Sequence, residues 1–386
     1  MGVNLGWILG LVAGTAAAAS AQSTTNKHYE ESPGAQKPAP TGELAPRLQN
    51  LGAHTFRVTT KSRKAQLFVN QGVNLAYGFN HAEAGRAFRE AARLDPACAM
   101  AYWGQAFVLG PTIKVPMTPE DEPKALELVQ KAVALKAKAS LRERAYIDAL
   151  AKRYSGKKED RAAGDAAFSE AMRDVVRRFP NDLDAATIHA EALMDLRPWN
   201  YWMRDGRPYP GTNDIVATLE KVLTRKAAHP GANHLYIHAM EATKPEKAEA
   251  AADRLLKLMP GAGHMVHMPS HIYQRVGRYA DAAASNEAAV KADEDSITQC
   301  RAQGLYPMAY YPHNIHFLWF AATAEGRSQV AIEAGRKTAT KVTDEALDQV
   351  PVLAGFRVVP WYALTRFGKW DEMLTEKAPP DRFLSS

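Results

Sequence analysis

Cysteine is nearly absent from this sequence. Its 386 residues include two cysteines, Cys98 and Cys300, which lie far apart in the chain. Two thiols cannot form the disulfide framework that holds small secreted domains together. We therefore expect both thiols to be buried in a fold that a hydrophobic core stabilises. The composition agrees, because 46% of the residues are hydrophobic and 23% are charged.

Familiar catalytic signatures are missing as well. The sequence has no G-x-S-x-G nucleophile motif, no Walker loop for phosphate and no H-E-x-x-H zinc motif. Concentrated charge is also missing, because the net charge of +6 is spread along the chain and basic clusters such as residues 61–64 are short. A diffuse basic surface does not indicate nucleic-acid binding, so we expect no nucleic-acid partner.

Charge is absent from the N-terminus. Residues 5–19 form an apolar, alanine-rich run that is too short for a comfortable membrane span. The small residues Ala19-Ser20-Ala21 follow it and resemble a cleavage site, so residues 1–21 are predicted to be a signal peptide. We expect a mature chain that begins at Gln22, has no membrane span and is periplasmic or secreted. Residues 22–60 are expected to be a flexible linker.

A 34-residue period is the strongest pattern in the rest of the chain. In its first copy, Gly72, Leu75, Ala84, Phe88, Ala91 and Pro96 stand at offsets 8, 11, 20, 24, 27 and 32. Small residues at two of these offsets let paired helices approach closely, and the proline ends the second helix. The frame recurs from His229, Gly263, Pro312 and Ala354, with Gly277, Gly326 and Gly368 in equivalent turns.

This pattern resembles the tetratricopeptide (TPR) repeat over most of residues 60–376. The resemblance implies an all-α, right-handed superhelical solenoid of about seven helix pairs over residues 61–376, followed by a tail at 377–386. It also implies that offsets 2, 5, 9, 12 and 13 of each first helix line a concave groove. The segments HPGANHLYIHAMEA, GHMVHMPSHIYQRVGRY and YPHNIHFLWFAA resemble exported bacterial TPR proteins with histidine-rich first helices. That group brings no established activity to this chain.

Three insertions interrupt the period, at residues 110–123, 197–213 and 296–311. Long insertions in a solenoid tend to be functional loops on one face. The second insertion is rich in aromatic residues, including Trp199 and Trp202. We expect it to shape a pocket or to exclude water from one.

Histidines gather in the middle of the chain, where nine of the twelve lie between residues 189 and 316. On the frame from Gly263, His264, His267 and His271 occupy offsets 2, 5 and 9, which share one helix face. On the next frame, His313 and His316 occupy offsets 2 and 5. Because equal offsets in neighbouring repeats point the same way, His264 is expected beside His313, and His267 beside His316.

The preceding repeat adds His234, His238 and Glu241 to one helix face, with spacings of four and three. These residues are expected to complete the site, to hold a second ion, or, for Glu241, to act as a general base. Tyr273 is a further candidate acid, base or radical site, although aromatic residues at such positions more often pack between helices.

A transition metal is the ligand that this histidine cluster favours, because imidazole lone pairs need a shared cation when they are packed together. Met265 and Met268 lie among the histidines and hint at copper, although methionine at helical spacing is more often core packing. Zinc and iron stay open. The rival hypothesis is a scaffold without catalysis, whose concave groove binds a peptide, a protein or a small molecule.

Overall fold

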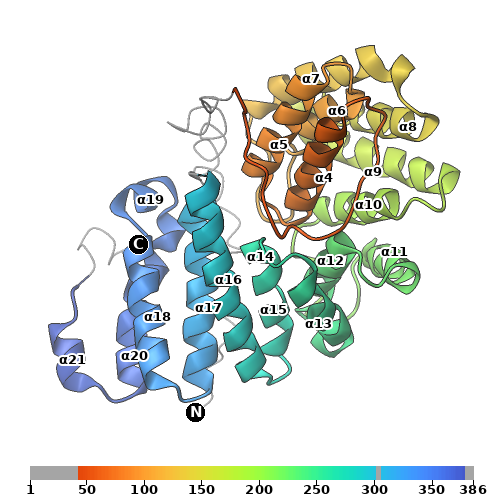
Figure 1. The fold of residues 1–386 in the computed structure, drawn as a ribbon. Coiled ribbons are helices and arrows are strands. Elements are labelled where there is room, and N and C mark those ends of the chain that lie inside the picture. Colours follow the sequence, from red (N-terminus) through yellow and green to blue (C-terminus); the bar gives the residue numbers. More distant parts are fainter. Residues whose placement is uncertain (1–41, 301–305, 379–386) are drawn as a thin grey trace.

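The computed structural model describes residues 42–300 and 306–378 (Figure 1). Within these ranges the chain forms helices and turns, and its strand-like pairing is one isolated bridge between Trp202 and Pro208. None of the helices in the described ranges is long and apolar enough to cross a membrane. The expected signal peptide, the first part of the expected linker and the last part of the tail lie outside the described residues.

The main helices pair in chain order into antiparallel hairpins. Eight pairs occur in the described residues: α4 (Arg63–Tyr77) with α5 (His81–Leu94), α6 (Ala99–Phe107) with α7 (Asp121–Leu135), α8 (Leu141–Leu150) with α9 (Arg161–Arg178), α10 (Leu183–Asp195) with α11 (Thr212–Arg225), α12 (Pro230–Met240) with α13 (Glu249–Leu258), α14 (Gly263–His267) and α15 (Pro269–Tyr273) with α16 (Tyr279–Cys300), α17 (Tyr311–Ala324) with α18 (Ser328–Lys341), and α20 (Val359–Arg366) with α21 (Trp370–Thr375).

Short elements join these hairpins. They are α19 (Asp344–Gln349), the 3₁₀ turns Lys136–Lys138, Lys158–Asp160, Pro245–Ala248 and Pro351–Val358, and the π-helical turn Tyr306–Tyr310. The architecture is the all-α superhelical repeat that the 34-residue period predicts. The expected number of pairs was about seven. The difference arises between residues 99 and 228, where insertions hide the period and three hairpins form.

Local sequence signals explain where many of the helices begin and turn. Ser62 and Asp182 accept hydrogen bonds from the backbone N–H groups of Ala65 and Ala185, and Ser140 forms a reciprocal capping box with Glu143. The equivalent turn glycines are left-handed, with φ of 82° at Gly277, 77° at Gly326 and 65° at Gly368. Only glycine adopts this conformation without strain, so these turns follow the sequence period.

Residues 42–60 are a packed arm, which contradicts the expectation of a flexible linker for that part of residues 22–60. The backbone N–H of Leu48 donates to Gln71 on α4 at 2.9 Å. The ring of Phe56 is buried and stacks on Trp103, with ring centroids 5.9 Å apart. The apolar residues of this arm have no helical or strand period, so the pattern of the sequence did not reveal them.

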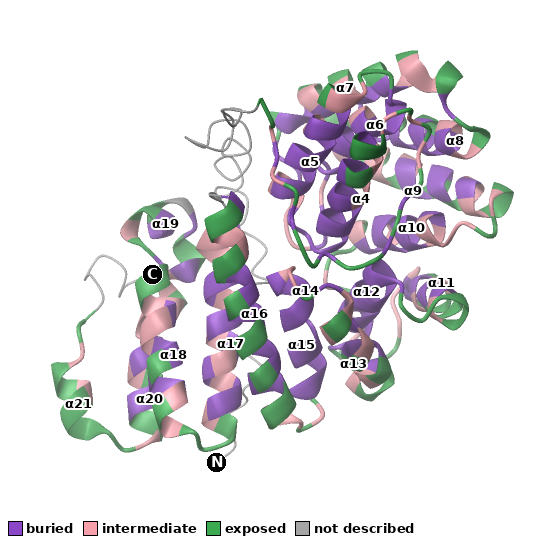
Figure 2. Cartoon of the chain, viewed as in Figure 1, coloured by how far each residue is buried: buried purple, intermediate pink, exposed green. Residues whose placement is uncertain are grey.

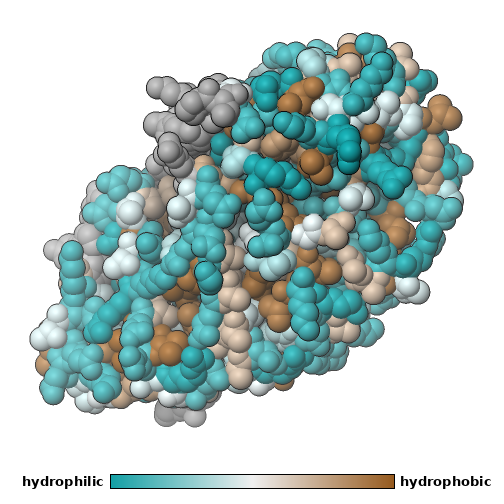
Figure 3. Space-filling model, in the orientation of Figure 1, coloured by the Kyte–Doolittle hydropathy of each residue, from teal (hydrophilic) through white to brown (hydrophobic). Residues whose placement is uncertain are grey.

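The superhelix closes on itself at its centre. Helix α4 packs against α12, and the backbone N–H of Gly261 donates to the carbonyl of Asn50 on the arm at 2.8 Å. Every residue of α12, α14 and α15 is buried, and Figure 2 shows α14 and α15 in purple beside the green outer faces of α13 and α16. The outer face in Figure 3 is mostly hydrophilic. The histidine-rich helices are therefore the centre of the molecule.

Both cysteines are free and buried, as expected.

Candidate metal centre

Three successive first helices position the histidines. His234 and His238 lie one turn apart on α12, and His313 lies on α17. The helix between them carries the rest and is interrupted at Met268, because Pro269 has no backbone N–H to continue the hydrogen-bond ladder. His264 and His267 lie before the interruption, and His271 lies after it.

The first triad consists of His234, His238 and His264, whose ligand atoms all lie within 4.8 Å of one another. His234 Nδ1 donates to the backbone carbonyl of Tyr77 at 2.6 Å, and His238 Nδ1 donates to Glu241 Oε1 at 2.8 Å. The Nε2 atoms of His234 and His238 are buried and have no hydrogen-bond partner among the described residues. Both rings therefore present an Nε2 lone pair to the middle of the triad.

The second triad consists of His267, His271 and His313, again with ligand atoms within 4.8 Å of one another. His267 Nδ1 donates to Asn286 Oδ1 at 2.7 Å, and His271 Nδ1 donates to Glu241 Oε2 at 2.7 Å. The orientation of the Asn286 amide follows from its nitrogen, which donates to a backbone carbonyl. His267 Nε2 and His271 Nε2 then face each other at 2.9 Å.

The hydrogen-bond partners of the Nδ1 atoms decide which ring nitrogens can bind a ligand. An acceptor on Nδ1 holds the imidazole proton there and leaves Nε2 as a lone pair. Two lone pairs at 2.9 Å, as on His267 and His271, repel unless a cation lies between them. Burial lowers the pKa of His267 well below its ordinary value, so a proton on that ring is a poor candidate for the cation. A metal ion fits the donor set, because neutral imidazoles are common ligands of zinc, copper and iron.

Glu241 joins the two triads into one centre. Its two carboxylate oxygens accept from His238 in the first triad and His271 in the second. Burial alone would raise the pKa of Glu241, but its interactions with the His271 and His238 rings, including a hydrogen bond from each, lower that pKa well below its ordinary value. The ring centroids of these two histidines are 5.8 Å apart, which equals the separation between His271 and His313 within the second triad.

Aromatic rings enclose each triad. The centroid of Phe79 lies 4.6 Å from that of His234, and the centroid of Phe317 lies 4.6 Å from that of His271. Trp199, from the aromatic insertion, lies edge to face with His238 at 5.2 Å. Phe79 and Trp199 have left-handed φ values of 54° and 63°, which are strained for these residue types. Such strain is characteristic of functional sites, where surrounding contacts maintain it.

Lys114 enters the centre from the first insertion. Its Nζ lies 3.4 Å from His264 Nε2 and 5.1 Å from the ring centroid of Tyr310. Burial lowers the pKa of Lys114 to about 7, although the charge of Glu241 opposes this shift. The insertion at 110–123 therefore contributes to the site, as the broken period predicted.

A third group, formed by His54, Asp184 and His229, has the wrong tautomers for a metal. His229 Nδ1 accepts from a backbone N–H, and His54 Nδ1 lies 3.0 Å from the ammonium of Lys226. Both Nε2 atoms consequently carry the proton and donate to Asp184 Oδ1, at 2.9 Å from His54 and 3.2 Å from His229. Hydrogen bonds satisfy this group, and it serves as an internal contrast to the two triads.

Several expected positions need correction. His316 belongs to neither triad, because its ring packs at 5.0 Å against both Trp319 and Phe356. His313 lies beside His267 instead, so the facing helices are shifted by one turn from the expected register.

His264 accordingly faces His234 and not His313. The hydroxyl of Tyr273 donates to Asp253 on α13 at 2.7 Å, which directs it away from the centre. The methionines Met265 and Met268 are part of the hydrophobic core.

Some residues of the centre could not be found by sequence reasoning. The carbonyl of Tyr77 leaves no trace in the side-chain pattern, and Asn286 lies on α16, outside the histidine-rich first helices. Lys114 is one cation within an insertion, and nothing in the sequence directed it toward the histidines. Tyr77 and Lys114 reach the centre from other hairpins, and Asn286 reaches it from the second helix of the hairpin that carries His267.

Comparisons with known proteins concern the fold. No protein-family model and no curated protein sequence matches the chain. Solved structures that resemble it include a tetratricopeptide repeat protein from Parabacteroides merdae, at 11% identity and a TM-score of 0.32, covering 76% of this chain and 99% of the other. The human IFIT1 dimer with m7Gppp-AAAA has 10% identity and a TM-score of 0.40, covering 82% and 68%. Yeast Tom70 has 11% identity and a TM-score of 0.29, covering 82% and 84%. These scores are too low to carry an argument about function, and it is the eight helix pairs of the described residues that give the chain its tetratricopeptide-type fold.

Proposed function

We propose that this protein binds two transition-metal ions, one in each histidine triad, and that it works as a metal-dependent enzyme. The observation that carries the proposal is the set of Nδ1 hydrogen bonds to Tyr77, Glu241 and Asn286. These bonds aim Nε2 lone pairs at two common points inside a buried centre. If these buried imidazoles had a purely structural role, each Nε2 atom would need a hydrogen-bond partner within the protein.

Each triad supplies three ligands, which leaves a coordination position for water or substrate. Two neighbouring ions of this kind can polarise an oxygen of the substrate and lower the pKa of a bound water. The residues of the chain would orient the ligands through Glu241 and would exclude solvent through Phe79, Phe317 and Trp199. The metal identity stays open among copper, zinc and iron, because all three accept imidazole.

Metal analysis of purified, untagged protein tests this proposal. We expect about two ions per chain in the wild type, and loss of one ion in His238→Ala and in His271→Ala. The double variant should lose both. His316→Ala is the matched control, because this histidine lies outside both triads, and it should keep full metal content. A wild type without tightly bound metal, or triad variants with unchanged metal content, would refute the proposal.

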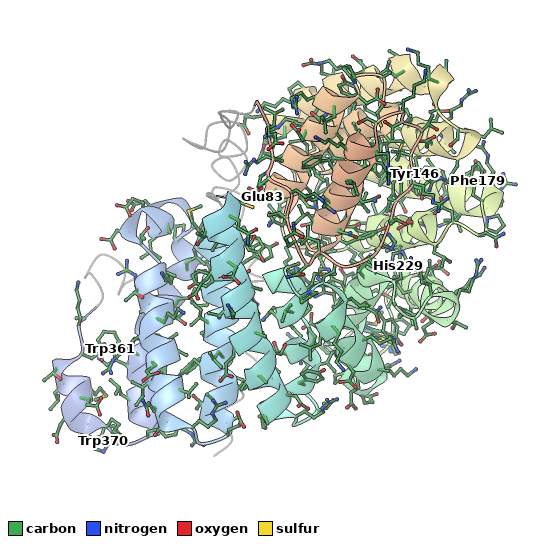
Figure 4. All side chains as sticks on the ribbon, in the orientation of Figure 1. Glu83, Tyr146, Phe179, His229, Trp361 and Trp370 are labelled. Atoms are coloured by element: carbon green, nitrogen blue, oxygen red, sulfur yellow. The ribbon has the colours of Figure 1, made fainter. Side chains whose placement is uncertain are left out.

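A second candidate function is peptide binding at a separate groove. This open groove has a volume of about 850 Å³ and lies between the arm and the N-terminal ends of α8, α10 and α12 (Phe179 and His229, two of its lining residues, are labelled in Figure 4). Its lining cations are Arg57, Arg142, Arg178 and Lys226. Its acidic groups are engaged within the protein, as Asp182 is with Arg142. An acidic peptide segment is the ligand that this lining favours.

Fluorescence anisotropy with a labelled glutamate-rich peptide tests the groove. Binding should weaken with salt and should fall in Arg178→Glu, while His271→Ala should bind normally. Equal binding of an uncharged peptide of the same length would exclude this function.

A further inference from the structure

Lys114 has no ion-pair partner among the described residues. Among the described residues, the contacts of its Nζ are the imidazole of His264 at 3.4 Å and the face of Tyr310 at 5.1 Å, and no carboxylate lies within ion-pair distance. Lysine is almost never fully buried without a charge partner. The chain has nonetheless placed this side chain, on the stretch without helix between α6 and α7, against a ligand of the first triad. Something that this chain does not supply is expected to pair with it.

The charge of the metal-loaded centre also implies that an anion from outside the chain binds there. The two triads contain six imidazoles, which are neutral when they bind a metal, and Glu241 is the carboxylate that contacts them. Two divalent ions would therefore bring four positive charges against one negative charge. A net positive charge of this size in a buried site is costly unless exogenous anions complete it. The histidine ligands leave open positions where such an anion could bind.

Burial differs between the residues of the centre. The α12 and α14 histidines are fully buried, and His267 has an exposed fraction of 0%. Lys114 and His313, by contrast, are half-buried. We therefore expect an incoming ligand to enter beside Lys114 and His313. This is the position of a group that selects the ligand and orients it.

We propose that the substrate or bridging ligand of this centre is an oxyanion, a carboxylate or a phosphate, that binds the two metal ions and pairs with Lys114. The inference rests on the proposed metal-binding function. Lys114 is a specificity residue in this account: its ammonium donates to one oxygen of the anion while the other oxygens face the ions. The ring face of Tyr310 lies 5.1 Å from the lysine Nζ, on its other side from the anion in this account. An uncharged substrate would leave both Lys114 and the ions without compensation.

Cobalt loading gives a direct test, because the visible absorption of Co²⁺ changes when its ligands change. Wild-type protein loaded with two equivalents of Co²⁺ is titrated with inorganic phosphate and, separately, with acetate, at constant ionic strength set with chloride. We expect a saturable spectral change with at least one of the two anions. The stronger binder tells whether the natural ligand carries a phosphate or a carboxylate.

Substitution of the lysine then tests its role. Lys114→Met should keep two bound Co²⁺ ions and should weaken anion binding by roughly tenfold or more, since a hydrogen bond from a charged donor has about this effect. Lys114→Arg should restore part of the affinity. Lys257→Met, which removes an exposed lysine of α13, is the control and should match the wild type.

The possible failures are distinguishable. If wild-type protein binds no Co²⁺, the metal centre itself is wrong and the inference falls with it. If Co²⁺ binds but neither anion changes the spectrum, or if Lys114→Met binds the anion as tightly as the wild type, the inference alone is overturned. Melting curves of the metal-free variants show whether each protein is folded before it is loaded.

Discussion

Replacing Glu241 with glutamine should disable one triad and spare the other. The carboxylate accepts from His238 Nδ1 at 2.8 Å and from His271 Nδ1 at 2.7 Å, with a different oxygen for each. A glutamine amide has one oxygen and one NH₂ group, so it can accept from only one ring. The other ring would face a donor, and its proton would move from Nδ1 to Nε2. A protonated Nε2 cannot bind a metal, so that ring would be lost as a ligand.

The magnitude follows from the role of such outer partners, whose loss typically costs 10–100-fold in metal affinity. We therefore expect Glu241→Gln to keep one ion near wild-type affinity and to bind the second about 10–100-fold more weakly. Isothermal titration calorimetry of the metal-free protein would resolve the two binding events. The choice of the weakened triad depends on the orientation of the amide, and the histidine NMR signals of the variant would identify it.

Glu220→Gln is the matched control, because Glu220 also accepts a side-chain hydrogen bond, from the hydroxyl of Tyr236, but lies outside the centre. It should bind both ions normally. Circular dichroism should show unchanged helix content in both variants. Two unweakened binding events in Glu241→Gln would refute the reasoning, because they would mean that Nδ1 partners do not decide which nitrogen binds the metal.

Other predictions concern stability and processing. Burial lowers the pKa of His189 to about 4, so its contribution to stability is complete above its unfolded pKa of about 6.5 and is lost as the pH falls toward 4. His189→Gln should therefore reduce the acid-induced fall in the free energy of unfolding by up to about 3 kcal/mol, as measured by urea titration. Phe56→Ala should lower that free energy by about 3–5 kcal/mol, because the ring is buried between the arm and the first hairpins, whereas a mobile arm would give no change. N-terminal sequencing of protein from cells should begin at Gln22, and retention of Met1 in cytosolic material would exclude export.

The repeat fold could be predicted because its signals are local. A small residue such as Gly72 approaches Phe88 within the same hairpin, and turn glycines such as Gly277 recur at one offset. These constraints repeat in every pair, so the sequence displays them many times. The packed arm at 42–60 does not repeat, and its partners lie on α4, α5 and α6, so its pattern resembled a linker.

The site was only partly predictable for a related reason. The spacing of His264, His267 and His271 predicted that they share one helix face, and all three lie in the centre. A π-helical turn at Tyr306–Tyr310 precedes α17, and the 34-residue frame does not contain it. In the structure His313 takes the place that the frame gave to His316. Contacts across the closed superhelix, such as that from His234 to Tyr77, have no periodic signal at all.

The packing of α4 on α12 changes how this molecule should respond to thermal fluctuation. Open solenoids behave as one-dimensional chains, in which each repeat is stabilised only by its neighbours and the ends fray first. Here the first hairpin is tied to the fifth, and one core runs from the arm to α16 and includes Ala321 of α17, while α17, α18 and α20 also share a separate, smaller core. Amide hydrogen exchange should accordingly report one large cooperative unit that contains α12, α14 and α15, and a C-terminal unit around α18 and α20 that opens independently and at lower free energy.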